Sequence, residues 1–263
     1  MLYRKSASTM VAVILLGSFL SLSVTAQSRN TSQRTLLAVG AHAGDMEVSC
    51  GAALVKQKQL GDRIVILHLT LGEGGNPKLS PEEYGRQKQS EAKAAAAVIG
   101  AEMILGPYKD GELPNDEPAR RYVAEVIRTI KPSILITHWK RSIHKDHAAA
   151  SAVTVDAELL ASLTAVKTEH PPYGGVKAIL FAENWEDKEG FTPYTYVNVS
   201  GAMESWEKSA KAYEFIRGGI SSFPYFEYYR ALARVRGVEA GMADAVAFDI
   251  DPMGKKQVLQ SLP

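Results

Sequence analysis

Apolar segments and segments with helical spacing alternate along most of this chain. Short runs rich in apolar and β-branched residues predict buried strands at residues 35–41, 63–70, 101–105, 134–138, 176–182 and 194–199. Apolar positions at helical spacing predict helices at residues 48–59, 81–99, 119–130, 146–165, 201–216 and 223–235. The alternation predicts a single α/β domain over residues 35–250, with a Rossmann-like, mostly parallel sheet and helices on both faces.

The first 26 residues have the layout of a secretory signal peptide. Two basic residues precede an apolar run over residues 10–22, and residues 24–26 offer a small-x-small cleavage site. A membrane anchor that stays uncleaved is the alternative, although the run is shorter than the about 20 apolar residues that a spanning helix needs. We therefore expect export to the periplasm or the exterior after cleavage near Ala26, a flexible lead-in over residues 27–34 and a frayed tail over residues 251–263.

Composition excludes several classes of partner. The chain has 263 residues, 46% of them hydrophobic, which is enough for one large core, and its net charge of +1 argues against nucleic-acid binding. No glycine-rich nucleotide-binding motif follows a predicted strand, so a nucleotide cofactor is not expected. The single cysteine, Cys50, rules out an intramolecular disulfide, and we expect it to be a small buried side chain.

Two clusters of His and Asp follow two of the predicted strands. His42 and Asp45 lie in the first strand-to-helix turn, and His144, Asp146 and His147 follow the strand at residues 134–138. Open α/β sheets bind ligands at the carboxyl ends of their strands, so these clusters can face one point. One such pair alone is explained by helix capping, but two clusters in the same kind of location favour a metal site.

The residue types suit a catalytic metal. Such a metal takes three protein ligands and leaves one position for water, and His42, Asp45 and His147 would supply two nitrogens and one carboxylate. His144 could then protonate a leaving amine or stabilise an oxyanion. Asp146 could orient one of the imidazole rings through its other nitrogen, or simply cap the helix.

These residues resemble the motifs of the LmbE-like, or PIG-L, family of zinc-dependent N-acetylglucosaminyl deacetylases. That family has an Ala-His-Pro-Asp-Asp-x-Glu turn, which reads Ala-His-Ala-Gly-Asp-Met-Glu at residues 41–47 here, and a His-x-Asp-His segment, matched at residues 144–147. Lesser matches are residues 70–74, a helix that contains Glu91, and Asp110. The resemblance covers residues 35–248.

The resemblance implies an enzyme that removes acetyl from an N-acetylated amino sugar or a related small molecule or glycan. It implies that His42, Asp45 and His147 hold Zn²⁺, and that His144 acts on the tetrahedral intermediate and the leaving amine with Asp146 in support. Mixed His and carboxylate sites also accept other divalent metals.

The resemblance also implies residues that contact the substrate. A basic residue shortly before Glu91 contacts substrate in the family, and here Arg86 and Lys88 both qualify because the register is ambiguous. Asp110 is the third candidate for the substrate site. Among the aromatic residues, we expect those near Trp139 to lie closest to the site, because they follow a strand end.

One departure from the family pattern affects the proposed chemistry. The family's general base stands at the position of Gly44, and such a base is worth roughly 10²–10⁴-fold in rate. Glu73 or Glu47 could replace it, or the metal could activate water unaided in a slow enzyme. Alternatively, the protein could bind a sugar or a metal without turnover, or it could hydrolyse another amide or a glycosidic bond.

Overall fold

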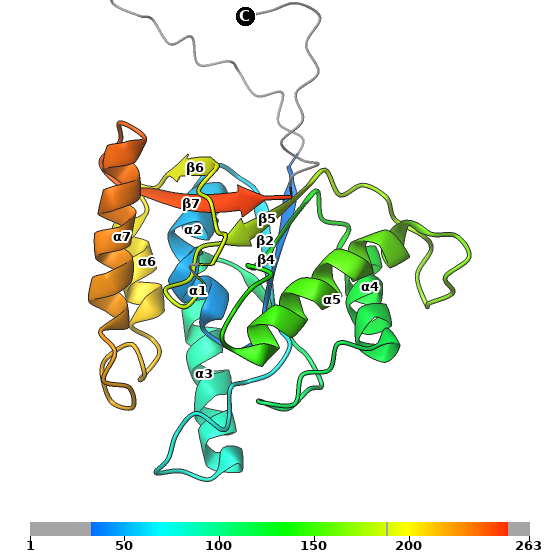
Figure 1. Cartoon of the computed structure of the whole chain (residues 1–263), viewed down its shortest axis with the longest axis horizontal. Coiled ribbons are helices and arrows are strands. Elements are labelled where there is room, and N and C mark those ends of the chain that lie inside the picture. The colour runs from blue at the N-terminus through cyan, green and yellow to red at the C-terminus, as the bar shows by residue number, and fades with distance from the viewer. Residues whose placement is uncertain (1–32, 188, 252–263) are drawn as a thin grey trace, which may run out of the picture. The chain divides into compact units, whose positions relative to one another are not determined.

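A seven-stranded sheet forms the centre of the computed structural model, which describes residues 33–187 and 189–251 (Figure 1). Its strand order is β3-β2-β1-β4-β5-β7-β6, and all neighbouring pairs are parallel except those made by β7, which runs antiparallel to β5 and β6. The strands are β1 (Thr35–Gly40), β2 (Arg63–His68), β3 (Glu102–Leu105), β4 (Ile134–His138), β5 (Ala178–Ala182), β6 (Thr195–Asn198) and β7 (Ala245–Ile250). The predicted α/β fold with a mostly parallel sheet is confirmed.

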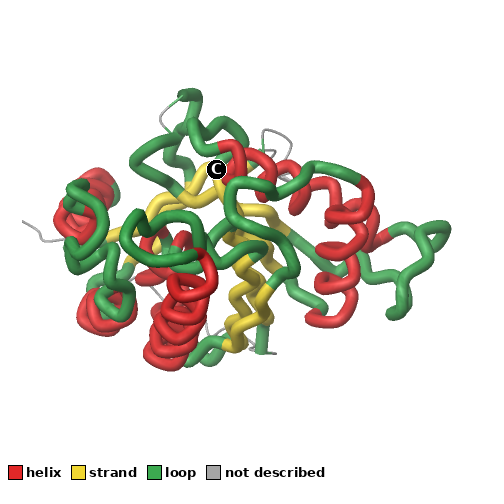
Figure 2. Tube along the Cα trace, turned by 90° about the horizontal axis from the view of Figure 1, so that it is seen from below, coloured by secondary structure: helices red, strands yellow, loops and turns green. Residues whose placement is uncertain are grey.

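Helices cover both faces of this sheet, as Figures 1 and 2 show. One face carries α1 (Asp45–Ser49), α2 (Gly51–Gln59), α3 (Pro81–Ile99), α6 (Met203–Ala210) and α7 (Tyr225–Glu239). The other face carries α4 (Glu117–Ile130) and α5 (Lys145–Ser162).

Strand β1 shows how one sequence pattern serves both layers. Leu36 and Ala38 pack into the core that is shared with the first helical layer, whereas Leu37 and Val39 pack against α4 and α5. Successive side chains of a strand point to opposite faces, so a strand buried on both faces has a continuous apolar run rather than an alternating one. This continuous run is why the central strands were predictable.

The order of the strands places a crevice between β1 and β4. The chain proceeds outward from β1 to β2 and β3, and then returns to the other side of β1 to form β4 and β5. Such a reversal separates the loops at the carboxyl ends of the two central strands and creates the usual ligand site of this class of fold. The two predicted His and Asp clusters follow these strands.

Three elements differ from the sequence-based expectations. The helix expected at residues 48–59 is two short helices, because Cys50 has φ −129° and ψ 7° and interrupts the first one. The helix expected over residues 201–216 ends at Ala210, and turns continue to α7. Strand β7 was not predicted, because a short apolar run near the end of the chain has no periodicity that identifies a strand.

The N-terminal expectations lie almost entirely outside the described residues. The signal peptide, most of the lead-in and the tail from residue 252 fall there, so they stay predictions. Within the described part, Arg34 donates to Asp62 at 2.5 Å, and Cys50 is fully buried as expected. Among these residues no helix has both the length and the apolar character to cross a bilayer.

Candidate metal centre and cavity

The turn after β1 brings His42 and Asp45 to the same side of the backbone. Gly44 has φ 107° and ψ −23°, a left-handed conformation that favours glycine, and α1 begins at the next residue. The backbone N–H of His42 donates to Asp45 Oδ2 at 2.7 Å. This hydrogen bond fixes the carboxylate beside the imidazole of His42, whose Nδ1 lies 3.3 Å from the same oxygen.

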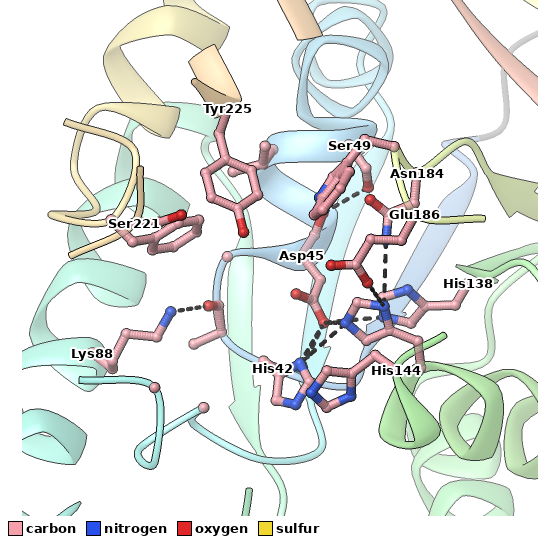
Figure 3. Close-up of a pocket in the computed structure, with 18 of the residues that line it drawn as sticks. His42, Asp45, Ser49, Lys88, His138, His144, Asn184, Glu186, Ser221 and Tyr225 are labelled. Carbon is pink, nitrogen blue, oxygen red and sulfur yellow. Dashed lines mark hydrogen bonds and ion pairs between the residues drawn. The ribbon is translucent and has the colours of Figure 1, made fainter. Parts of the chain in front are cut away.

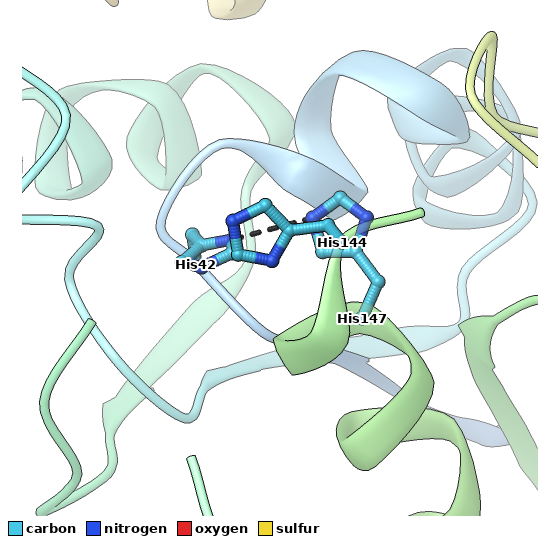
Figure 4. Close-up of side chains that lie close together, drawn as sticks. All are labelled: His42, His144 and His147. Carbon is cyan, nitrogen blue, oxygen red and sulfur yellow. Dashed lines mark hydrogen bonds between the residues drawn. The ribbon is translucent and has the colours of Figure 1, made fainter. Parts of the chain in front are cut away.

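His147, from the first turn of α5, completes a group of three potential metal ligands. Figure 4 shows its ring beside that of His42, and Figure 3 shows Asp45 beside His42. The Nε2 of His147 lies 3.2 Å from His42 Nδ1 and 3.6 Å from Asp45 Oδ2. Ligand atoms about 2.0–2.2 Å from a tetrahedral zinc lie roughly 3.3–3.6 Å from one another. The three atoms therefore have the spacing of a mononuclear metal site, although His147 lies 105 positions after His42 in the sequence.

Other sets of three residues compete for this role, among them His42, His144 and His147. Asp45, His138 and His147 also lie close enough to hold an ion. However, His138 Nε2 accepts the backbone N–H of Ala41 at 3.0 Å, so its lone pair is already used. The His138 ring instead stacks on His147, with 4.1 Å between centroids, and its Nε2 lies 3.1 Å from Asp45 Oδ2. His42, Asp45 and His147 therefore remain the candidate ligand set.

Two carboxylates approach the other nitrogen of His42. Its Nε2 lies 3.0 Å from Asp110 Oδ1 and 3.5 Å from Asp146 Oδ2. The backbone N–H of Gly111 donates to Asp146 Oδ2 at 2.7 Å and holds that carboxylate in place. The Asp146 carboxylate therefore orients the expected ligand His42, whereas the family resemblance implied support for His144. Asp110 has the same role while it also lines the cavity.

His144 faces the cavity from the start of α5. Its Nδ1 accepts the backbone N–H of Asp146 at 3.3 Å, which leaves the proton of the neutral ring on Nε2. The ring centroid lies 4.6 Å from that of His42 and 4.8 Å from that of His147. Burial, followed by the charge of His42, lowers the pKa of His144, so the neutral ring is favoured.

The protonation states of the group couple metal binding to proton release. Burial opposes charge on His42, but Asp45 foremost, with Asp110 and Asp146, raises its pKa well above 6.5. Burial also disfavours the charged form of Asp45, yet His147 and His42 lower its pKa well below the usual range. Burial and then His138 lower the pKa of His147 to about 2. His147 is therefore a neutral ligand already, and His42 must lose a proton when a metal binds.

Phe215 fills the space beside Gly44. A Cβ built on Gly44 would lie 2.9 Å from Phe215 Cε1 and 3.0 Å from Cζ, which is too close for any side chain without movement of the ring. Glycine at this position is therefore required twice, by the positive φ and by the aromatic ring. The position of the family's general base therefore carries no carboxylate in this chain. It is also covered by Phe215, which comes from the segment between α6 and α7.

Neither of the carboxylates that we predicted as substitute bases lines the cavity. Glu73 Oε1 accepts the backbone N–H of Asp110 at 2.9 Å, and this places its side chain against the loop. Glu47 is fully buried, where its Oε1 accepts the Tyr213 hydroxyl at 2.7 Å and lies 3.2 Å from His68 Nε2. Glu186 was missed, yet it lines the cavity, and its Oε2 lies 3.8 Å from His147 Nδ1.

The ambiguity between the two basic residues of α3 is resolved by burial. Arg86 is exposed and does not line the cavity, so the structure does not place it at the site. Lys88 is buried, and its ammonium group donates to the carbonyl of Ala43. The same nitrogen lies 4.4 Å from the ring centroid of Phe215 and 4.8 Å from that of Tyr213.

The ligand atoms lie in a cavity of about 240 Å³. The expectation for Trp139 was wrong, because this residue is buried outside the cavity, where its Nε1 donates to the carbonyl of Glu189 at 2.8 Å. The aromatic residues that line the cavity are Tyr84, Trp185, Phe215, Tyr225 and Tyr229.

Sequence reasoning also missed two residues behind and beside His147. His138 is the last residue of β4, so its place at a central strand end was a usable signal. Asn184 belongs to the loop after β5; its Nδ2 lies 3.3 Å from His147 Nδ1, and its Oδ1 accepts the Tyr229 hydroxyl at 2.6 Å. No sequence pattern marked Asn184, because only the pairing of β4 with β5 brings this loop to the site.

Part of the chain, including this site, matches a described family. Residues 37–158, which contain the three ligands and His144, match the family model "PIG-L: GlcNAc-PI de-N-acetylase". The chain is 28% identical to a conserved protein from Thermus thermophilus, with a TM-score of 0.74 over 87% of this chain and 99% of that one.

Two characterised relatives carry different activities in their names. The 4-oxalmesaconate hydratase of Pseudomonas putida is 23% identical over 81% of this chain and 84% of that protein. A 1D-myo-inositol 2-acetamido-2-deoxy-alpha-D-glucopyranoside deacetylase of Thermomonospora curvata is 31% identical over 50% of this chain. That match spans only 54% of the deacetylase. Relatives of this chain therefore include both deacetylases and a hydratase.

Proposed function

The chain carries a PIG-L family domain at residues 37–158, and from this premise we propose that it is a metal-dependent hydrolase that removes acetyl from an amine. The observation that carries the proposal is the convergence of His42 Nδ1, Asp45 Oδ2 and His147 Nε2 at separations of 3.2–3.6 Å inside a cavity.

These three residues would hold the metal, and zinc is favoured by the family resemblance. A bound divalent metal would polarise the acetamide carbonyl and lower the pKa of a water molecule. The protein's own side chains orient the residues that would bind the metal. Asp146 and Asp110 orient His42 through Nε2, which fixes Nδ1 as the coordinating atom.

His144 would stabilise the charge that develops on the substrate. Hydrolysis breaks the bond between the acetyl carbon and the nitrogen, and the nitrogen must gain a proton as it leaves. The neutral ring of His144, which lines the cavity, carries its proton on Nε2 because Nδ1 accepts the Asp146 N–H. We propose that Nε2–H donates a hydrogen bond to the carbonyl oxygen as that oxygen gains charge, and that the proton taken from the attacking water passes to the leaving amine.

Glu186 is our candidate for the carboxylate that accepts the proton of the attacking water. Among the described glutamates only Glu186 lines the cavity, and its Oε2 makes no hydrogen bond with the protein. It approaches from the loop after β5, whereas the family's base stands in the turn after β1. A base in a less direct position would give slow turnover. This is the expected consequence of losing the family's carboxylate at the position of Gly44.

Acetate release from N-acetylated amines tests this proposal. We expect the zinc-loaded protein to release acetate, a chelator to abolish the release, and His144→Ala and Glu186→Gln each to lower kcat by at least about tenfold. The control is Glu189→Gln, an exposed carboxylate outside the cavity. Acetate release that persists in the chelated protein, or that is unchanged in His144→Ala, would refute the mechanism.

Addition of water to a carbon–carbon double bond is the second candidate activity. Two observations favour it: the relative matched over 84% of its length is a hydratase, and Phe215 covers the position of the family's base. The same assay separates the two, because hydration removes the ultraviolet absorbance of a conjugated acid and releases no acetate.

Export through the N-terminal segment is a separate proposal, which the mass of the mature protein in the periplasm or medium would test.

A further inference from the structure

One side of the cavity is aromatic, while the other carries the imidazoles. In Figure 3, Tyr225 and Lys88 lie on the far side of Asp45 from His138. Phe215 and Tyr225 meet at right angles with 5.5 Å between centroids, and Tyr225 lies 6.2 Å from Trp185 in the same manner. Trp185 in turn stacks on Phe223 at 4.1 Å. These contacts join the aromatic rings into a continuous wall.

This wall replaces a polar group of the family pattern by an apolar one. The position that carries a carboxylate in the family is Gly44 here, and the Phe215 ring stands where that side chain would be. A ligand next to the metal ligands therefore meets an apolar ring at the place where the family presents a charge. The exchange changes which ligand is bound as well as which group acts as base.

Two hydroxyls on this side of the cavity are already paired with the protein. Ser49 Oγ donates to the carbonyl of Asp45 at 2.6 Å, and the Tyr229 hydroxyl donates to Asn184 Oδ1 at 2.6 Å. A pyranose carries several hydroxyls, each of which loses its hydrogen bonds to water on binding and needs a replacement. These two hydroxyls offer a sugar no free donor, whereas a planar apolar ring needs none.

Lys88 adds one charge to this apolar surface. Its ammonium has three donors, and the hydrogen bond to the Ala43 carbonyl uses one of them. The nitrogen sits 4.4 Å from the Phe215 ring centroid, so an acidic group on a ring stacked against Phe215 would lie within its reach. Burial lowers the pKa of Lys88, and the nearby carboxylates of Asp45, Glu91, Glu47 and Asp110 oppose that shift. A charge held at this depth attracts a carboxylate more strongly than an exposed one.

We infer that the Phe215 wall and Lys88 select a planar aromatic acid, so that the acetamide this site takes is that of an aromatic amine rather than of an amino sugar. The inference rests on the proposed function for the nature of the bond, and on Phe215, Tyr225 and Lys88 for the group attached to the nitrogen. Pre-formed aromatic walls of this kind bind flat ligands with little loss of side-chain entropy.

A matched pair of acetamides tests this inference. Binding of 4-acetamidobenzoate and of N-acetylglucosamine to the zinc-loaded full-length protein is measured by calorimetry. We expect the aromatic acetamide to bind at least tenfold more tightly than the sugar. Phe215→Ala should remove most of that advantage, and Phe215→Leu, which keeps more of the packing, should remove part of it. Lys88→Met should weaken the binding of 4-acetamidobenzoate but not that of acetanilide, which has no carboxylate.

Phe191→Ala is the control, because Phe191 packs against Trp139 outside the cavity, and it should keep the full preference. Equal or tighter binding of the sugar, no binding of either compound, or an unchanged preference in both folded Phe215 variants would overturn the inference. Acetate release tests the proposed function separately. If the protein prefers the sugar and hydrolyses it, only this inference is refuted. If it binds the aromatic acetamide in a way that depends on Phe215 but releases no acetate, only the proposed hydrolase activity is refuted.

Discussion

At the scale of single residues, the contact between Gly44 and Phe215 is the most informative departure from the family pattern. Sequence alone identified the missing base but not what replaces it, because Phe215 lies far along the chain in a segment that was expected to be helical. A positive φ was a foreseeable reason for Gly44, whereas the aromatic contact depends on tertiary packing.

Restoring the family's carboxylate therefore requires two changes. We expect Gly44→Asp alone to lower the free energy of unfolding by about 1–3 kcal/mol, because the new side chain overlaps the Phe215 ring. We expect Gly44→Asp with Phe215→Ala to turn over N-acetylglucosamine about 10²-fold or more faster than the matched Gly44→Ala/Phe215→Ala protein. Equal rates for the two double variants would show that this position cannot hold a working base. A wild type that is inert beside an active double variant would favour the binding-only alternative.

The pKa of His42 makes metal binding pH-dependent. Its pKa in the metal-free protein is raised well above 6.5, despite burial, mainly by Asp45. The stabilisation from protonated His42 is present below pH 6.5 and is lost as the pH rises through the raised value. We therefore expect the Tm of the metal-free protein to fall above pH 6.5 while zinc affinity rises.

Calorimetry in buffers of different ionisation enthalpy measures the coupled proton. We expect release of up to one proton per zinc bound near neutral pH, and the same release in His170→Gln, whose imidazole contacts Glu125 of α4 instead. Zinc affinity that does not change with pH between 6 and 8 would contradict the assignment of a charged His42.

At the scale of elements, local periodicity predicted whether most segments are helices or strands. It did not predict which loops meet at the site. Helix α3 was predicted with its observed bounds from its Ala-, Glu-, Lys- and Gln-rich composition and from Gly100 at its end. In the structure Ser80, Pro81 and Gly100 provide a capping box, a first-turn proline and a left-handed C-cap. The loop after β5 carried no signal, yet it supplies Asn184 and Glu186. Their place depends on strand pairing, which a single sequence does not reveal.

Helix α5, which carries His144 and His147, ends at a buried guanidinium. Arg128 of α4 donates to the carbonyls of Leu160, Ala161 and Leu163 at 2.9–3.2 Å. Each buried carbonyl left without a partner costs about 1–3 kcal/mol, so we expect Arg128→Met to lower the free energy of unfolding in urea by about 3 kcal/mol or more.

The matched control for Arg128 is Arg121→Ala, also on α4, where the guanidinium is exposed and pairs with Glu117. We expect that change to cost less than about 1 kcal/mol. Similar urea midpoints for the two variants would show that the cap on α5 contributes little.

At the scale of the whole molecule, the fold explains why two distant clusters meet. Turns at the ends of β1 and β4 are neighbours only because the strand order reverses between them, and the sequence predicted both turns as strand ends. The meeting of His42, Asp45 and His147 was therefore predictable, while the aromatic wall and Glu186, which depend on the segments after β5 and α6, were not.

The most direct test is metal analysis of the wild-type protein beside His147→Ala, after zinc reconstitution and exhaustive dialysis. The account predicts about one zinc per wild-type chain, and loss of that zinc in a His147→Ala protein that keeps its fold by circular dichroism. A wild type that retains no zinc, or a variant that retains as much as the wild type, would contradict it.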